Sequence, residues 1–285
     1  MADESKKPEP PKAEPKSEGA KAVNPEVQSE VEKKAAEKRA QLLKDAQAAL
    51  EETQKAVEAL DQGKKDDALA ALERVTGKLD LIVARDPKLA LAPIGVATIV
   101  RDLYSTPEVA KEAVKTAKSY LGDGKVQQAR ALLGALASEE EVQVSNLPLA
   151  TYPAAIKAIA PLIDAGKMEE AKTALHIALN TIVVESYIIP LPKVRAKAML
   201  GEAEKLSEKS GRNADENKKL HELVEDARHE LHLGEVLGYG TKDDYKVLYG
   251  QLDDIQKKTE AGKSGQGFFD KIKESLKNFK ERIAG

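Results

Sequence analysis

Four side chains with metal-binding chemistry lie along one predicted helix near the C-terminal third of the chain: His221, Glu225, His229 and His232. At 100° per residue they span about 80° of the helix surface. Imidazoles together with a carboxylate are suitable ligands for a divalent metal such as zinc. The apolar residues of the same helix centre on nearly the opposite side, so the histidines should face water. We therefore expect a solvated polar face, with neither a metal nor another cofactor.

Two glycine motifs have the look of nucleotide-binding loops. Gly262-Lys263-Ser264 matches the end of a phosphate-binding loop, but that motif needs a glycine five residues earlier, where Lys257 stands. It also needs a preceding strand, which is not predicted here. Gly238-Tyr239-Gly240 fits the end of a helix. Because no nucleophile–base pair, metal cluster or phosphate loop can be read from the chain, we expect a protein that is not an enzyme.

A third candidate site surrounds Tyr187, in the turn Ser186-Tyr187-Ile188-Ile189-Pro190. A tyrosine hydroxyl that emerges beside a broken helix can line a ligand pocket, with Arg195 one turn further along. It can equally anchor the corner by bonding a free backbone carbonyl. We favour the anchor and keep the pocket as the alternative.

The C-terminal residues 267–285 form an amphipathic pattern. They hold all the phenylalanines of the chain, and one helical stripe contains six apolar side chains: Phe268, Phe269, Ile272, Leu276, Phe279 and Ile283. The glycine-rich stretch 261–267 predicts a flexible tether. So short a helix should be poorly ordered alone and helical only when docked.

The partner of this C-terminal helix is left open by its sequence. It can dock on its own domain, on a second subunit, on a client protein or on an anionic membrane surface. Five basic and three acidic residues give it a net charge of only +2, so any attraction to lipid is weak.

Composition narrows the class of protein. Ala, Leu, Lys and Glu dominate, aromatic residues make up 4%, and there is no cysteine, so disulfides and thiolate chemistry are excluded. A net charge of −3 argues against nucleic acid as a partner. No apolar run is long enough to span a bilayer, and the N-terminus lacks an apolar signal-peptide core, so we expect a cytoplasmic protein.

A repeated motif indicates the helices that must carry these residues. This phrase, G-K-x-x-x-A-x-x-[AL]-L, occurs three times, beginning at Gly63, Gly124 and Gly166. A glycine between two apolar-periodic runs supplies the left-handed residue that ends a helix, and the small alanine allows two helices to approach closely. The phrase therefore predicts three αα-hairpin corners. We expect an all-α (mainly α) fold of packed αα-hairpins, with room for one minor two-stranded β element.

Three β-branched patches follow the hairpins: Leu81-Ile82-Val83, Val142-Gln143-Val144 and Ile182-Val183-Val184. Each fits a buried helix end or a short strand, and alternation over residues 141–145 favours a strand for the second.

The chain divides into four predicted parts. Residues 1–24 are rich in proline and charge and should be a disordered tail. Asn24-Pro25 should open a helical domain over residues 25–237, whose first long helix runs to Gly63. Residues 238–266 are expected to be a linker with a short helix, and residues 267–285 the tethered basic helix.

The central part of the chain resembles the YfdX family of bacterial proteins. The resemblance is carried by Leu149-Ala150-Thr151-Tyr152-Pro153, then Gly166-Lys167, then Glu185-Ser186-Tyr187-Ile188-Ile189-Pro190-Leu191 and Arg195, and it is clearest over residues 147–206. It implies a mainly helical fold and an association with heat and acid tolerance, with chaperone-like or small-molecule binding as suggested roles. It brings no catalytic residues. Many members begin with a secretory signal, from which this N-terminus departs.

The sequence and the resemblance together predict a non-enzymatic stress-tolerance protein that binds unfolded or partner proteins through grooves between helices. Its partners would be client proteins or its own subunits in a homo-oligomer, with weak membrane contact of the C-terminal helix as a further option. The alternative is a small-molecule sensor or sequestering protein with a pocket near Tyr187.

Overall fold

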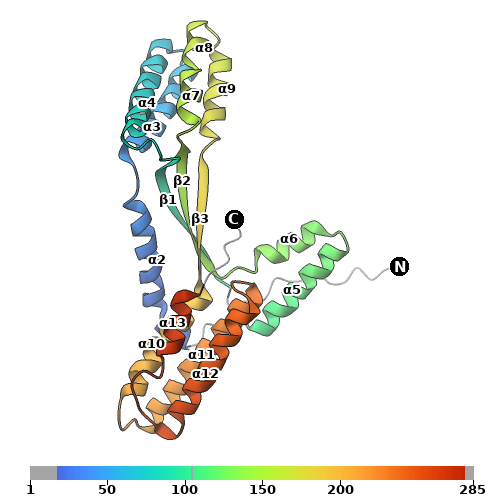
Figure 1. Ribbon diagram of the computed structural model, residues 1–285. Helices are drawn as coiled ribbons and strands as arrows, with labels where there is room; N and C mark the ends of the chain where they lie inside the picture. The colour runs from blue at the N-terminus through green and yellow to red at the C-terminus, as the bar shows by residue number, and fades with distance from the viewer. Residues whose placement is uncertain (1–17, 104, 280–285) are drawn as a thin grey trace, which may run out of the picture. The chain divides into compact units, whose positions relative to one another are not determined.

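The computed structural model describes residues 18–103 and 105–279 and is 69% helical, with one small antiparallel sheet (Figure 1). The mainly helical expectation is confirmed. The β element has three strands rather than two, in the order β1-β2-β3. The strands are β1 (Leu91–Arg101), β2 (Glu139–Pro148) and β3 (Val183–Pro190). The second β-branched patch lies in β2 and residues 183–184 of the third lie in β3, whereas residues 81–83 lie inside a helix.

The chain forms two compact units, and each is built from separated stretches of sequence. One unit, here the inserted unit, contains residues 33–98 and 142–187, and the other, the terminal unit, contains residues 1–32, 99–141 and 188–285. The boundary falls within each strand of the sheet and within one long helix. A single helical domain over 25–237 is therefore a wrong division.

The inserted unit is a helical bundle with a core of alanine and aliphatic side chains. Its helices are α3 (Lys44–Asp61), α4 (Lys65–Arg85), α7 (Tyr152–Lys157), α8 (Ala160–Asp164) and α9 (Met168–Leu179). At its centre the hydroxyl of Tyr152 donates a 3.1 Å hydrogen bond to Oγ1 of Thr53, and both side chains are fully buried. The aromatic ring and this bond join α7 to α3.

The terminal unit has a larger core formed by its last helices. Its helices are α1 (Glu18–Ala22), α5 (Pro107–Gly122), α6 (Val126–Gly134), α10 (Leu191–Glu208), α11 (Ala214–Leu237), α12 (Lys242–Thr259), the 3₁₀ turn η1 (Glu260–Gly262) and α13 (Asp270–Asn278). Helix α2 (Asn24–Arg39) contributes residues to both units. Helices α10 and α11 pack together as a long hairpin.

All three predicted corners are present and share one hydrogen-bonding pattern. Gly63, Gly124 and Gly166 have φ of 70°, 72° and 74°, in the left-handed region. At the first corner the N–H of Lys64 donates to the carbonyl of Ala59 at 2.8 Å, which closes a Schellman motif, and the other two corners repeat this bond. The alanine five residues after each glycine is completely buried. The repeated phrase therefore encodes a backbone conformation and a close helix contact.

The predicted boundaries need three corrections. Residues 18–24 are not a disordered tail, because Ala20 in α1 and Val23 just after it lie in the core of the terminal unit; residues 1–17 lie outside the described part of the chain. The single helix up to Gly63 is broken after Arg39, where the N–H of Leu43 donates instead to the carbonyl of Pro93 in β1 at 2.9 Å.

The third correction concerns residues 238–266, which are not a linker. Helix α12 spans 18 residues and buries one face in the core of the terminal unit, contributing Tyr245, Leu248, Leu252 and Ile255. A capping box between Thr241 and Asp244 starts the helix, which is the signal that the interpretation as a linker overlooked.

Candidate functional site

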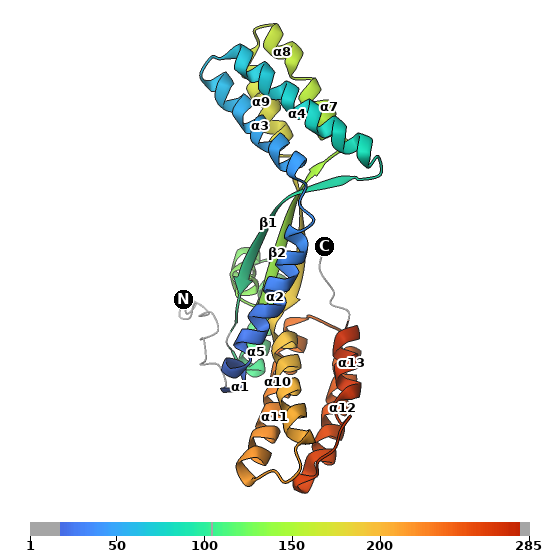
Figure 2. The ribbon, with the colours of Figure 1, turned by 90° about the vertical axis from the view of Figure 1, so that its left-hand side faces the viewer.

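The C-terminal helix α13 lies on the terminal unit, against α12 and α10 (Figure 2). Of its predicted apolar stripe, Phe269, Ile272 and Leu276 are at most 1% exposed and belong to the same core as the two helices beneath them. Their spacing of three and four residues places them on one face. Among the four docking sites left open by the sequence, the structure shows the first, the chain's own domain.

The phenylalanine rings at the two ends of α13 are partly buried. Phe279 packs edge-on against Tyr245, with ring centroids 5.3 Å apart. It also sits so close to Gly240 that a Cβ there would collide with it, and Phe268 lies similarly against Gly265. Ile283, the sixth residue of the predicted stripe, lies outside the described residues. The glycines of the supposed linker thus provide room for aromatic rings.

Polar contacts hold α13 at its rim. The ammonium of Lys273 bonds both carboxylate oxygens of Glu204 in α10, at 3.0 and 2.8 Å. The side-chain amide of Gln251 in α12 donates to Oγ of Ser275 at 2.9 Å. Helix α13 therefore rests on apolar side chains and is bonded at its rim by polar side chains of both α10 and α12.

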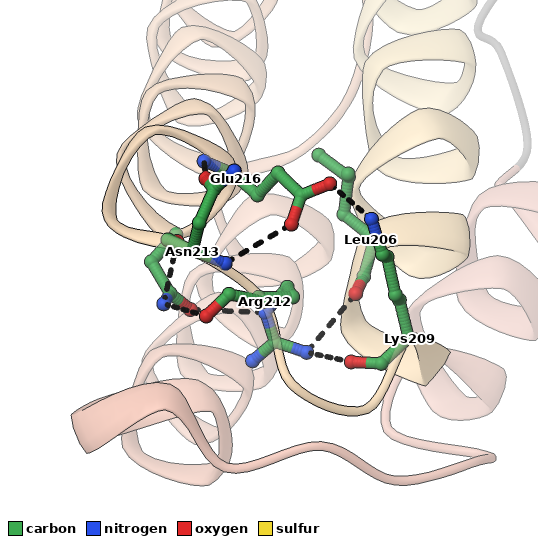
Figure 3. A network of polar contacts seen from close by, with 6 residues as sticks. Leu206, Lys209, Arg212, Asn213 and Glu216 are labelled. Atoms are coloured by element: carbon green, nitrogen blue, oxygen red, sulfur yellow. Dashed lines mark hydrogen bonds and ion pairs between the residues drawn. The ribbon is translucent and has the colours of Figure 1, made fainter.

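Arg212, in the turn between α10 and α11, fastens the tether before α13, and Figure 3 shows its bonds to the end of α10. Nη1 of this guanidinium donates to the carbonyls of Leu206, Ser207 and Lys209 at the end of α10, at 2.9–3.1 Å. Nη2 donates to the carbonyl of Lys263 at 2.6 Å. One arginine thus closes the end of α10 and ties down the chain that leads into α13. The stretch 261–267 is pinned, and its Gly262-Lys263-Ser264 segment follows a helix rather than a strand.

Tyr187 and Arg195, the residues of the predicted ligand pocket, have separate surroundings. Tyr187 lies within β3, not at a helix corner, and the ammonium of Lys38 stands 3.7 Å from its ring centroid. This is a cation–π contact in place of the expected hydroxyl anchor. Arg195 lies in α10 with its guanidinium bonded to Asp102 at 2.6 Å and 3.9 Å from Glu230. The pocket stays a prediction that these contacts do not favour.

The surroundings of Arg195 include a polar cluster that the sequence did not reveal. The hydroxyl of Ser138 donates to Asp102 at 3.2 Å, and its N–H donates to the hydroxyl of Tyr239 at 3.0 Å. Tyr239 in turn donates to Glu139 at 2.7 Å; burial raises its pKa, and so does this bond, because ionisation would place two negative charges together. The cluster joins the end of β1 and the start of β2 to α10 and to the second residue after α11. Its members are paired internally, which fits a role in holding these elements together.

The histidines of the first candidate site are spread along α11. His229 and His232 are exposed, as expected for a polar face, and His221 is half-buried. Across the described part of the chain, no three histidine or acidic side chains are grouped closely enough to hold a metal ion. Nor does any helix there combine the length and the apolar character required to cross a membrane.

Comparison with known families finds a match for the middle of the chain. Residues 49–188 match the model of the family described as YfdX protein. This chain contains a YfdX region. The YfdX region includes all three Gly-Lys corners and ends within β3, so Arg195, which the resemblance had included, falls beyond it. Helices α10 to α13, including the docked C-terminal helix, also lie outside it.

Solved structures and curated proteins add little to this assignment. A solved structure of YfdX from Salmonella Typhi is similar over 53% of this chain and 93% of that chain, at 17% identity and a TM-score of 0.36. So distant a likeness carries no functional argument. No curated protein matches the sequence.

Proposed function

We propose that this protein is a non-enzymatic bacterial stress-tolerance protein that binds segments of unfolded or partner proteins in a groove between α10 and α12. The main support for this proposal is that the groove already holds an amphipathic helix, α13, through three buried apolar side chains. Helix-in-groove binding relies on anchors spaced three and four residues apart, and many sequences can supply them.

In this proposal α13 is the internal competitor of such segments. A helix of nine residues has little stability of its own, so its occupancy depends on the groove and on the tether. Because the tether keeps it close, its effective concentration is high, and a client must offer a longer or more apolar face to displace it. Release of α13 would then leave Phe269, Ile272 and Leu276 free to contact partners, as the sequence had suggested.

A locking experiment tests the groove directly. The chain has no cysteine, so Gln251→Cys with Ser275→Cys can be joined by a short bis-maleimide that holds α13 in place. The same protein without the cross-linker is the matched control. We expect the uncross-linked protein to suppress aggregation of a heated model client and the locked protein to lose this activity.

A variant that weakens the docking of α13 tests the opposite effect. Ile272→Ala with Leu276→Ala should strengthen suppression, whereas Ile177→Ala, at an exposed position in the inserted unit, should leave it unchanged. A thermal melt shows whether the double variant is folded. Equal client aggregation with locked and unlocked protein would refute the proposal, whatever the double variant does.

A further inference from the structure

The three Gly-Lys hairpins share more than their corners. Aliphatic residues stand three positions before and nine positions after each glycine: Leu60 and Leu72, Leu121 and Leu133, and Ile163 and Leu175. The first position lies near the end of the first helix of each hairpin, and the second is the eighth residue of the second helix. Their surroundings can therefore be compared directly among the three copies.

In the inserted unit two copies pack against each other. Leu60 and Leu72 are 4% and 3% exposed, Ile163 and Leu175 are both 0% exposed, and all four belong to one core. The contacts are reciprocal: α3, the first helix of one hairpin, touches α9, the second of the other, and α4 touches α7 and α8. Such first-with-second pairing is what a two-fold axis produces.

Within residues 18–103 and 105–279, no hairpin covers the third copy, α5–α6 in the terminal unit. Leu121 is 49% and Leu133 is 47% exposed, and Val126 beside the corner is 54% exposed. The positions that join the two helices of the hairpin are nevertheless closed, since Ala117 and Ala129 are buried. The hairpin is thus complete internally, and its contact with α11 is made by α5. What remains uncovered is the seam through which the other two copies meet.

We propose that this seam, formed by Leu121, Val126 and Leu133, docks the α5–α6 hairpin of a second copy of this chain. The occupant is indicated within the molecule, because both equivalent seams are covered by a hairpin carrying the same phrase. A second copy supplies an identical hairpin, and the reciprocal pairing of the inserted unit is the geometry that an isologous dimer requires. Leu121 of each protomer then contacts α6 of its partner, and Leu133 contacts the partner's α5 near the hairpin tip.

Sedimentation equilibrium of the full chain tests this interface. The wild type should show a concentration-dependent mass approaching twice the 30.8 kDa of one chain. Leu121→Glu with Leu133→Glu should raise the dimer dissociation constant at least about tenfold, because each protomer would place two carboxylates in an apolar seam. Val247→Glu, at a position 55% exposed on α12, is the matched control and should leave the mass unchanged.

A cross-linking measurement makes the result independent of the charge substitutions. Leu133→Cys is a mild change in a chain without cysteine, and a bis-maleimide should join its protomers covalently, while Val247→Cys should stay uncross-linked. A wild type that remains monomeric at every concentration overturns the proposal. The seam would then be a binding surface for a different protein. A dimer that survives the double substitution and is not captured through Cys at 133 overturns it equally.

Discussion

Nη2 of Arg212 donates a 2.6 Å hydrogen bond to the carbonyl oxygen of Lys263, 51 residues further along the chain. The same guanidinium closes the end of α10, so a single side chain couples the α10–α11 turn to the segment that carries α13. The occupancy of the proposed client groove therefore depends on a residue that does not line it.

Arg212→Ala should destabilise the terminal unit by about 3 kcal/mol, because several carbonyls lose a charged donor at a site that is 9% exposed. Hydrogen exchange should show faster opening of α13 than of α11. Arg74→Ala is the control, since the pair of Arg74 with Glu52 leaves the arginine 52% exposed and should cost at most about 1 kcal/mol. Equal losses in the two variants would contradict this coupling.

The buried hydroxyl pair of Tyr152 and Thr53 predicts an asymmetry between two conservative substitutions. Tyr152→Phe removes the donor while the Thr53 hydroxyl keeps its own 2.8 Å bond to the carbonyl of Ala49, so the loss should be about 1 kcal/mol. Thr53→Val leaves the Tyr152 hydroxyl buried without an acceptor and should cost about 2 kcal/mol. Urea denaturation of both variants checks the order, and a larger loss for Tyr152→Phe would show that the hydroxyl finds another partner.

Glu140 and Glu216 should respond to pH with opposite signs. Burial raises the pKa of Glu140, with further contributions from the charges of Asp102 and Glu32, and Arg195 opposes them. A raised carboxyl pKa means that the folded state binds the proton more tightly, so this group costs stability above its folded pKa and the cost disappears as the pH falls towards 4.5. Glu140→Gln should therefore raise the melting temperature at pH 7 and lose this advantage in acid.

For Glu216 the bond from Lys209 lowers the pKa, helped by the N–H of Asn213 in the capping box. Its contribution is present above the unfolded value of 4.5 and is lost as the pH falls through the folded pKa. Glu216→Gln should therefore lower the melting temperature at pH 7, with the difference shrinking in acid. Parallel pH profiles for the two glutamine variants would contradict these assignments.

Two glycines at the tip of α5 predict effects of opposite direction. Gly124 has φ of 72°, so Gly124→Ala should cost about 1 kcal/mol. Gly122 is helical with open space around it, so Gly122→Ala should stabilise the protein by about 0.5 kcal/mol. Chemical denaturation of the two variants checks the sign, and a gain for both would argue that the corner is not left-handed in solution.

The corners were predictable because a left-handed glycine and the alanine after it act locally. The strand β1 was not predicted, since Pro93 and Gly95 interrupt its β-branched run and its identity depends on pairing with β2. The docking of α13 was equally hidden, because the surface that it covers exists only once α10 and α12 have both packed on α11. The cluster of Arg195 joins residues as far as 101 positions apart, and no local pattern signals such a contact.

The interleaved path of the chain has a consequence for its synthesis. The polypeptide passes between the two units four times, at residues 32/33, 98/99, 141/142 and 187/188. Neither unit can be excised as one continuous fragment. On the ribosome, the inserted unit has its full sequence once residue 187 has emerged, while α1 must wait for α10 and α11, the helices against which it packs. Nascent chains of this protein will therefore expose Ala20 and Val23 until those helices follow, and holding them meanwhile is a task for the cell's own folding machinery.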